Sequence, residues 1–113
     1  MWDWFRKKNY REASIEELRT ALNKPDPDTV FIDVRTETEW VSGHLGPFLH
    51  IPMSALPDHF ENLKQYAHVY FLCYSGRRSE RACKMLAKAG HTGAINVRGG
   101  ISKWIARGYP VEH

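Results

Sequence analysis

Three short apolar runs alternate with stretches of helical pattern, and this alternation limits the folds open to the chain more than any other feature. The runs are rich in β-branched and aromatic residues and lie at residues 29–34 (TVFIDV), 68–73 (HVYFLC) and 94–97 (AINV). Continuous apolar runs of this kind are typical of strands buried on both faces of a parallel sheet. Because helices connect parallel strands and cover the sheet, we predict an α/β domain with a mostly parallel central sheet.

Capping and stop signals mark helices between and beyond these runs. Ser14 with Glu17 is a capping box that opens one helix, and Thr36 with Glu39 is a capping box that opens a second. We predict helices from residue 14 through about residue 22, at 36–43, at 54–64 (irregular), at 79–90 and at 100–108, and a loop with a short strand at 44–52.

Length and composition fit one globular domain. The sequence has 113 residues, 42% of them hydrophobic, and no internal repeat or low-complexity segment. We therefore expect one domain at residues 10–113 behind a tail at 1–9. The opening MWDWFRKK is too short to bury much apolar area as a membrane anchor, which favours a tail that frays or folds over the domain. Two cysteines, no apolar run near 18 residues and no apolar leader favour the cytoplasm.

The charge balance is mildly basic, with a formal net charge of +3 at pH 7. This excess favours small anionic ligands, but the sequence lacks the concentrated basic stripe of a nucleic-acid binder. It also lacks the ligand spacing of a zinc site and the glycine pattern of a nucleotide loop. We expect no metal, no cofactor, no nucleic acid and no membrane among its ligands.

The stretch CYSGRRS, residues 73–79, joins a predicted strand to a predicted helix and opens with a cysteine. Ligands of open α/β sheets bind beyond the carboxyl ends of the strands, which is where Cys73 lies. Gly76 allows the turn to curl and to aim its backbone N–H groups inward. Those N–H groups, the positive end of the helix, Arg77 and Arg78 would surround the sulfur with positive potential and lower the pKa of the thiol.

This loop predicts a nucleophilic thiolate that needs no histidine base, since none of the six histidines is spaced to pair with Cys73. The amides and arginines that favour a thiolate also bind a tetrahedral oxyanion, so sulfur and phosphorus oxyanions are both candidate ligands. The pattern leaves a second interpretation open, a buried structural cysteine beside solvated arginines.

Four other polar residues have both a functional and a structural interpretation. Asp33 and Arg35 end a strand and either tune Cys73 or, as we expect, form a buried ion pair or hydrogen bond. His44 is either a proton donor or a hydrogen-bonded structural residue, and the second is favoured because no partner is spaced with it. Cys83 is either a resolving thiol or, as favoured here, a packed core residue.

Basic residues recur at nearly helical spacing along the helix that follows the loop. They are Arg77, Arg81, Lys84 and Lys88. Such a face is usually only solvated. Here it is also placed to steer an anionic donor or an acidic protein acceptor toward the loop.

Four motifs occur in a fixed order along the chain. They are IDVRTETEW with the GHL that follows it, IP at 51–52, CYSGRRS, and RGGISKWIARGYPV at 98–111. With these motifs the chain resembles a single-domain rhodanese, a sulfurtransferase, over residues 14–111. The resemblance implies a single rhodanese-like doubly wound domain, with the active loop at the carboxyl edge of the sheet.

For the site residues, the resemblance implies sulfur transfer. Cys73 would attack the outer sulfur of a donor such as thiosulfate, release sulfite and hold a persulfide, which a thiophilic acceptor such as cyanide or a small or protein thiol then takes. Arg77 and Arg78 would bind the anionic end of the donor, and Ser79 would close the loop onto the helix. The substrate-binding residues that the resemblance implies are Tyr74, Ser75, Gly76, Arg77, Arg78 and Ser79.

Two other functions of this fold stay open. Related phosphatases and arsenate reductases have a loop one residue longer than the six residues 73–78, so loop length favours sulfur transfer. A non-catalytic rhodanese-like binding module also stays open, although the cysteine and both arginines of the loop are intact. Departures from the family pattern at Pro47, Phe48 and His50 bear on the neighbouring surface, and hence on the acceptor, rather than on the chemistry.

Overall fold

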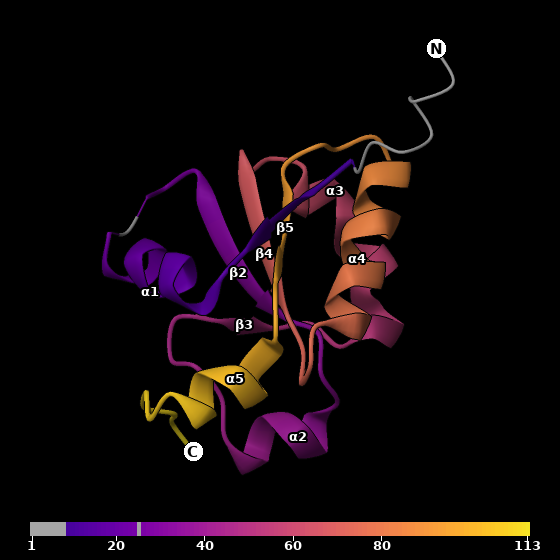
Figure 1. Cartoon of the computed structure of the whole chain (residues 1–113). Helices are drawn as coiled ribbons and strands as arrows, with labels where there is room; N and C mark the ends of the chain where they lie inside the picture. The colour runs from indigo at the N-terminus through magenta and orange to yellow at the C-terminus, as the bar shows by residue number, and fades with distance from the viewer. Residues whose placement is uncertain (1–8, 25) are drawn as a thin grey trace.

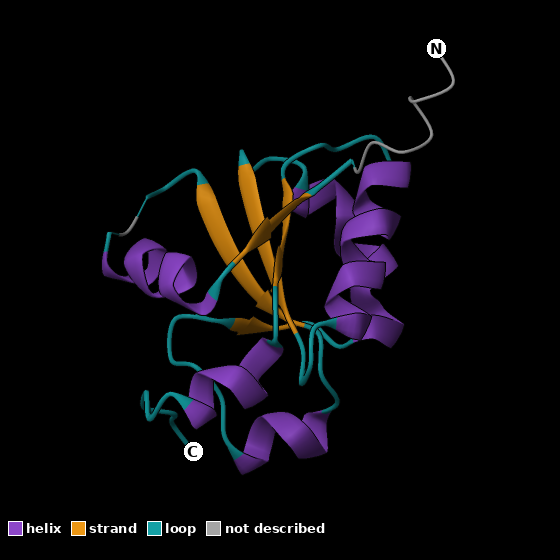
Figure 2. Cartoon of the chain, viewed as in Figure 1, coloured by secondary structure: helices purple, strands orange, loops and turns teal. Residues whose placement is uncertain are grey.

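A sheet of five parallel strands forms the centre of the structure, a computed structural model that describes residues 9–24 and 26–113 (Figures 1 and 2). The strands are β1 (Arg11–Ala13), β2 (Thr29–Asp33), β3 (Leu49–His50), β4 (His68–Leu72) and β5 (Ala94–Val97). They lie in the order β1-β5-β4-β2-β3. The three apolar runs form β2, β4 and β5, which confirms the predicted parallel sheet, and β1 is a strand that the sequence signals missed.

Helices lie on both faces of the sheet and beyond its carboxyl edge (Figure 1). They are α1 (Ile15–Asn23), α2 (Glu37–Ser42), the 3-10 helix η2 (Met53–His59), α3 (Phe60–Leu63), α4 (Arg77–Lys88) and α5 (Gly100–Ala106). On one face, α1 and α5 pack over a core that includes Leu72 and Trp104 (Figure 1). On the other face, α3 and α4 pack over a core that includes Phe71 and Leu86. Helices on both faces of a parallel sheet confirm the predicted doubly wound α/β fold.

The helices predicted from the sequence are present, with boundaries that differ from the prediction by at most two residues. The first turns of α1 and α2 each contain the predicted capping box. The irregular helix predicted at 54–64 is present as η2 followed by α3. The helix predicted to begin at residue 79 begins instead at Arg77, because Gly76 adopts φ +104° and closes the turn two residues earlier.

The register of the strands brings three chain segments together at one edge of the sheet. Asp33 at the end of β2 pairs with Leu72 at the end of β4, and Phe71 pairs with Asn96 near the end of β5. Cys73 follows directly after β4. The carboxyl ends of β2, β4 and β5 therefore lie together at this edge of the sheet, where ligands of this architecture bind.

The tail predicted at residues 1–9 lies, apart from Asn9, outside the described residues, and so does the short anchor segment considered there. Within residues 9–24 and 26–113, none of the helices has both the length and the apolar character that crossing a bilayer requires.

Candidate active site

The loop between β4 and α4 places Cys73 at the carboxyl edge of the sheet. The carbonyl groups at the start of this loop face α5. The Ile101 N–H donates to the Cys73 carbonyl oxygen at 2.9 Å, and the Ser102 N–H donates to the Tyr74 carbonyl oxygen at 3.0 Å. The loop lies this close to α5 because Gly100 has no side chain, and a Cβ there would collide with both oxygens. With its carbonyl groups held by α5, the loop turns backbone N–H groups toward the sulfur.

The sulfur of Cys73 is buried among hydrogen-bonding groups, and 1% of the residue's surface is exposed. The Gly76 N–H donates to Sγ at 3.1 Å, and Ser79 Oγ lies 3.3 Å from Sγ. Burial by itself raises the pKa of Cys73. Hydrogen bonds from the Ser79 hydroxyl and from the N–H groups of Ser79, Gly76 and Ser75 outweigh that effect, so the pKa of the thiol lies below its ordinary value. The predicted arrangement of amides is present, and the reactivity of Cys73 stays a prediction.

An acidic residue from a distant part of the chain holds Arg78. The guanidinium donates from Nη1 and Nη2 to the two carboxylate oxygens of Glu39 at 2.7 and 2.9 Å, which ties the start of α4 to α2. The hydrogen bonds from Arg78 lower the pKa of Glu39 to about 2, and the same contact raises the pKa of Arg78. Arg78 therefore closes the loop against α2, and its part in donor binding stays a prediction.

Three of the predicted substrate-binding residues, Tyr74, Ser75 and Arg77, are exposed at the surface of the loop. Tyr74 is 55% exposed. Arg77 forms no ion pair within the described part of the chain, in contrast to Arg78. Arg77 is thus the loop guanidinium that an anion arriving from solvent meets without competition from a carboxylate.

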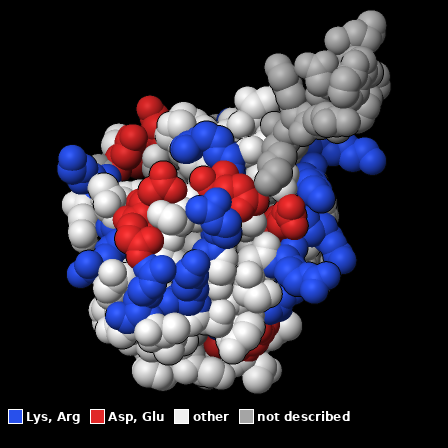
Figure 3. Space-filling view, in the orientation of Figure 1, with Lys and Arg blue, Asp and Glu red and all other residues white. Residues whose placement is uncertain are grey.

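The predicted basic face of α4 begins beside this loop. Four exposed cations with no ion-pair partner among the described residues follow one another along the helix: Arg77, Arg81, Lys84 and Lys88. Figure 3 shows basic side chains gathered along the α4 side of the molecule. A hollow of about 280 Å³ in this face is lined by Arg77, Arg78, Glu80, Arg81 and Lys84. Anions that approach from this side meet positive potential before they reach the loop.

Asp33 and Arg35 form the buried ion pair that was favoured from the sequence. The Asp33 carboxylate accepts from Nε and Nη2 of Arg35 at 2.9–3.0 Å. The guanidinium also donates to the carbonyl oxygens of Glu39 at 3.3 Å and Gly43 at 2.7 Å. The pair therefore positions α2, the helix from which Glu39 reaches Arg78.

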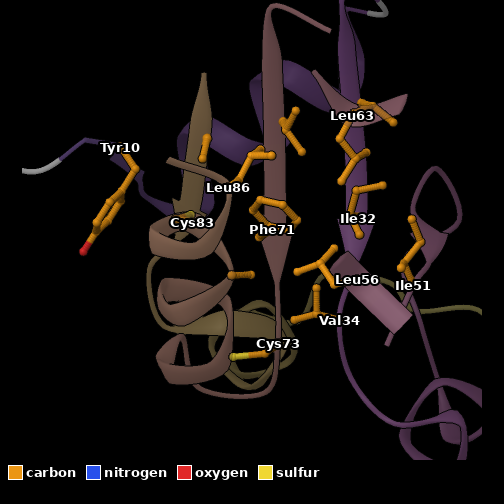
Figure 4. Close-up of a cluster of buried hydrophobic side chains, with 14 residues drawn as sticks. Tyr10, Ile32, Val34, Ile51, Leu56, Leu63, Phe71, Cys73, Cys83 and Leu86 are labelled. Carbon is orange, nitrogen blue, oxygen red and sulfur yellow. The ribbon is translucent and has the colours of Figure 1, made fainter. Parts of the chain in front are cut away.

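The surroundings of His44 and Cys83 fit the structural roles favoured from the sequence. The His44 ring stacks on Trp40 with centroids 3.8 Å apart, and its Nδ1 lies 2.9 Å from the Trp40 carbonyl oxygen. Cys83 is fully buried in the core cluster that contains Phe71 and Leu86 (Figure 4). Burial raises the pKa of the Cys83 thiol well above its ordinary value.

Two contacts of the site were not foreseen from the sequence. Ser79 Oγ donates to Asn96 Oδ1 of β5 at 2.5 Å, and Glu39, expected only as a cap of α2, also holds Arg78. A polar residue inside the buried run AINV was the available signal for the first contact, since buried polar groups need partners. The second contact has no local signal, because its residues lie 39 positions apart.

The arrangement supports the chemistry of a sulfur nucleophile. A buried sulfur lies under N–H donors at the start of a twelve-residue helix, and a guanidinium is exposed beside it. In the described part of the chain, no group of three or more His, Cys, Asp or Glu side chains is arranged to hold a metal ion.

Comparisons with known proteins place this geometry in a family. A family described as rhodanese-like domain matches residues 14–107. The chain is 33% identical to a protein of Allochromatium vinosum named sulfurtransferase, over 88% of this chain and 92% of that protein. It is 26% identical to a protein of Saccharomyces cerevisiae named thiosulfate:glutathione sulfurtransferase, over 88% of this chain and 81% of that protein.

A solved structure agrees with the sequence matches. A rhodanese-related protein from Thermoplasma volcanium superposes with a TM-score of 0.79 at 29% identity, and the match covers 91% of this chain and 98% of that one. The family match spans most of the chain and includes the whole Cys73 loop. The chain therefore belongs to the rhodanese-like domain family, and relatives similar to it include sulfurtransferases.

Proposed function

We propose that this protein is a thiosulfate sulfurtransferase that carries the transferred sulfur as a persulfide on Cys73. The observation that carries the proposal is the Cys73 sulfur held under the Gly76 N–H, in a loop with the exposed Arg77 beside it. Relatives named as sulfurtransferases support the reaction class, and the relative named for thiosulfate and glutathione supports the donor and a thiol acceptor.

The first half-reaction loads the sulfur. The Cys73 thiolate attacks the outer sulfur of thiosulfate, so that a new S–S bond forms at Sγ while the S–S bond of thiosulfate breaks and its electron pair leaves with sulfite. The lowered pKa of Cys73 raises the thiolate population at neutral pH. The N–H groups of the loop and the positive end of α4 also stabilise the negative charge of the persulfide.

The second half-reaction passes the sulfur on. Cyanide or a thiolate attacks the outer sulfur of the persulfide, the bond to Sγ breaks, and its electron pair returns to Cys73 as the thiolate. The product is thiocyanate or a persulfide of the acceptor. Because Cys73 is 1% exposed, the acceptor has to meet the outer sulfur, which extends beyond the buried Sγ.

Charge at the surface supports an anionic donor and an acceptor with an acidic surface as partners. Arg77 and the basic face of α4 attract the sulfonate end of thiosulfate and equally an acceptor protein with an acidic surface. Nucleic acid and membrane are not partners in this proposal. We place the activity in the cytoplasm, because Cys73 and Cys83 are both free thiols and the domain needs no disulfide.

Mass spectrometry of the intact protein tests the proposal. After incubation with thiosulfate and removal of excess donor, the wild-type protein should gain the mass of one sulfur atom, lose it on addition of cyanide, and release thiocyanate. Cys73→Ser should show neither step, whereas Cys83→Ser should load as the wild type does. Loading confined to Cys83, or full turnover in Cys73→Ser, would show that the proposal is wrong.

A second assay, with p-nitrophenyl phosphate as substrate, separates the other two functions of the fold. A phosphatase would release phosphate from p-nitrophenyl phosphate without gaining sulfur, and a binding module would do neither. The six-residue loop favours sulfur transfer over a phosphatase, and the lowered pKa of Cys73 favours a reactive thiol over a binding module.

A further inference from the structure

A chain of hydrogen bonds runs from Cys73 through two buried polar side chains to the neighbouring strands. Ser79 Oγ lies 3.3 Å from Cys73 Sγ and 2.5 Å from Oδ1 of Asn96. The amide nitrogen of Asn96 in turn donates to the Gly76 carbonyl oxygen at 3.3 Å and to the Glu12 carboxylate at 3.4 Å. Ser79 is fully buried and Asn96 is 4% exposed, so these contacts are shielded from bulk water.

The neighbours of Asn96 decide which way its amide points. Nδ2 faces two acceptors, the Gly76 carbonyl oxygen and a Glu12 carboxylate oxygen. If the amide were rotated by half a turn, Oδ1 would face both acceptors with no proton between them, which is strongly unfavourable in a buried site. Oδ1 of Asn96 is therefore fixed as the acceptor that Ser79 meets.

Ser79 has one hydroxyl proton and two neighbours that compete for it. Oδ1 of Asn96 carries no proton, so the short contact at 2.5 Å requires Ser79 to be the donor. When Cys73 is a thiol, its S–H donates to Ser79 Oγ, and Cys73, Ser79 and Asn96 all have hydrogen-bond partners. When Cys73 is a thiolate, Ser79 has to turn its proton to the sulfur, and Oδ1 of Asn96 is left without a donor.

We propose that Asn96 is a positioning residue that acts through Ser79: it competes with the Cys73 sulfur for the Ser79 proton and so sets the balance between thiol and thiolate at the nucleophile. The other end of the same amide holds the carbonyl of Gly76, the residue whose N–H donates to Sγ. The proposal rests on Cys73 being the nucleophile of the proposed sulfurtransferase. Its test requires no sulfur donor, so the two proposals fail separately.

The test is a double-mutant cycle read out by thiol titration. The rate of Cys73 alkylation by iodoacetamide is measured from pH 5 to 10, with the modified residue located by peptide mass. Ser79→Ala is introduced into the wild type and into Asn96→Ala, which has no acceptor for Ser79. Asn96→Val suits a buried strand and replaces Asn96→Ala if that variant does not fold.

We expect the loss of Cys73 alkylation rate on removal of the Ser79 hydroxyl to depend on which residue is at position 96. In Asn96→Ala the Ser79 proton is free for the sulfur, so Ser79→Ala should lower the alkylation rate at pH 7 about tenfold, as expected for loss of a hydrogen bond to a charged group. In the wild type the same change should lower the rate by less than about threefold, because Asn96 competes for the proton.

The cycle has one contrary outcome. An equal effect of Ser79→Ala in both backgrounds would show that Asn96 does not compete for the proton, and it would overturn the proposal. A purely structural role of Asn96 predicts that result, because loosening the loop changes the rate in every background by the same factor.

Discussion

The two cysteines are almost equally buried, yet the pKa of one thiol is lowered and the pKa of the other is raised. Cys73 is 1% exposed and Cys83 is fully buried, and both belong to the same core cluster (Figure 4). Hydrogen bonds hold the pKa of Cys73 below its ordinary value in spite of burial, whereas burial and the charges of Glu12 and Glu80 raise the pKa of Cys83. Burial alone thus makes a cysteine unreactive, and N–H groups aimed at the sulfur reverse that effect.

The position of each cysteine along the chain explains the difference. Cys73 precedes α4, so N–H groups of the loop and of the first helical turn have no carbonyl partner within the helix and can turn to the sulfur. Cys83 lies in the middle of α4, where backbone N–H groups are already bonded within the helix. A strand–loop–helix junction is therefore what turns a core cysteine into a candidate nucleophile.

The largest expected effect is the selectivity of alkylation. Iodoacetamide at pH 7 should modify Cys73 at least about 10³ times faster than Cys83. Cys73 has a lowered pKa and lies under a loop with exposed residues, so a small movement of that loop exposes the sulfur. Cys83 has a raised pKa and lies in the middle of α4, so it reacts only through opening of the core, which costs several kcal/mol. Peptide mass mapping over time gives both rates. The Cys73 rate should rise with pH and level off at a lower pH than that of an ordinary thiol. Comparable alkylation rates at Cys73 and Cys83 would contradict the conclusion that hydrogen bonds make only Cys73 reactive.

Removing the Cys83 thiol should affect stability and leave chemistry intact. Cys83→Ser places a hydroxyl in an apolar core and should lower the free energy of unfolding by about 2 kcal/mol, while sulfur loading of Cys73 stays complete. Urea unfolding and the thiosulfate mass assay measure the two effects, and Cys83→Ala is the control without a polar group. If Cys83→Ser instead loses as much turnover as Cys73→Ser, Cys83 is a resolving thiol.

The surroundings of Cys73 were foreseen wherever the signals are local. The apolar run that ends at Cys73, Gly76 in the turn and the two capping boxes lie within a few residues of the structure they specify, and each is present. Cys83 was expected in the core because the apolar face of α4 has helical periodicity. Chain order was therefore enough to place one cysteine at a sheet edge and the other in the core.

Contacts between distant segments were not foreseen. β1 has the sequence REA, which lacks any strand pattern, and it is a strand because it pairs with β5. Glu39 and Arg78, like Ser79 and Asn96, meet only once the strands are in register. Charge and polarity at these positions are compatible with many partners, and only tertiary packing selects one.

The contact between Glu39 and Arg78 offers a third test, since it supports the start of α4 beside Cys73 and not the middle of the helix, where Cys83 lies. Glu39→Gln should lower the free energy of unfolding at pH 7 by about 1.5 kcal/mol through loss of a charge-assisted pair. The pKa of Glu39 is lowered to about 2, so its contribution is complete above about pH 4.5 and disappears as pH falls toward 2. The difference between Glu39→Gln and wild type should shrink over that range.

Urea unfolding at pH 7 and at about pH 3 measures this change. Glu37→Gln is the matched control, because Glu37 is an exposed carboxylate in the same helical turn, and no ion pair of Glu37 is found within the described residues. A loss of stability in Glu37→Gln equal to that in Glu39→Gln would assign the effect to the charge of α2 rather than to Arg78.

The smallest expected effect concerns Arg77 and separates anion binding from activation of Cys73. Arg77→Ala should raise KM for thiosulfate about fivefold, equivalent to about 1 kcal/mol, because an exposed guanidinium beside the loop is screened by water. The alkylation rate of Cys73 at pH 7 should change by less than about twofold, since the groups that hydrogen-bond to the sulfur come from the loop and Ser79. Steady-state kinetics and thiol titration of one preparation give both values.

Lys88→Ala is the control for Arg77→Ala, because Lys88 carries the same charge at the far end of α4 and should leave KM nearly unchanged. Salt sharpens the distinction further. A KM effect that rests on an exposed cation should weaken as ionic strength rises, whereas a hydrogen bond to the buried sulfur should not. An unchanged KM together with a tenfold fall in the Cys73 alkylation rate would show that Arg77 activates the nucleophile, and that the loop amides do not account for the difference between the two cysteines.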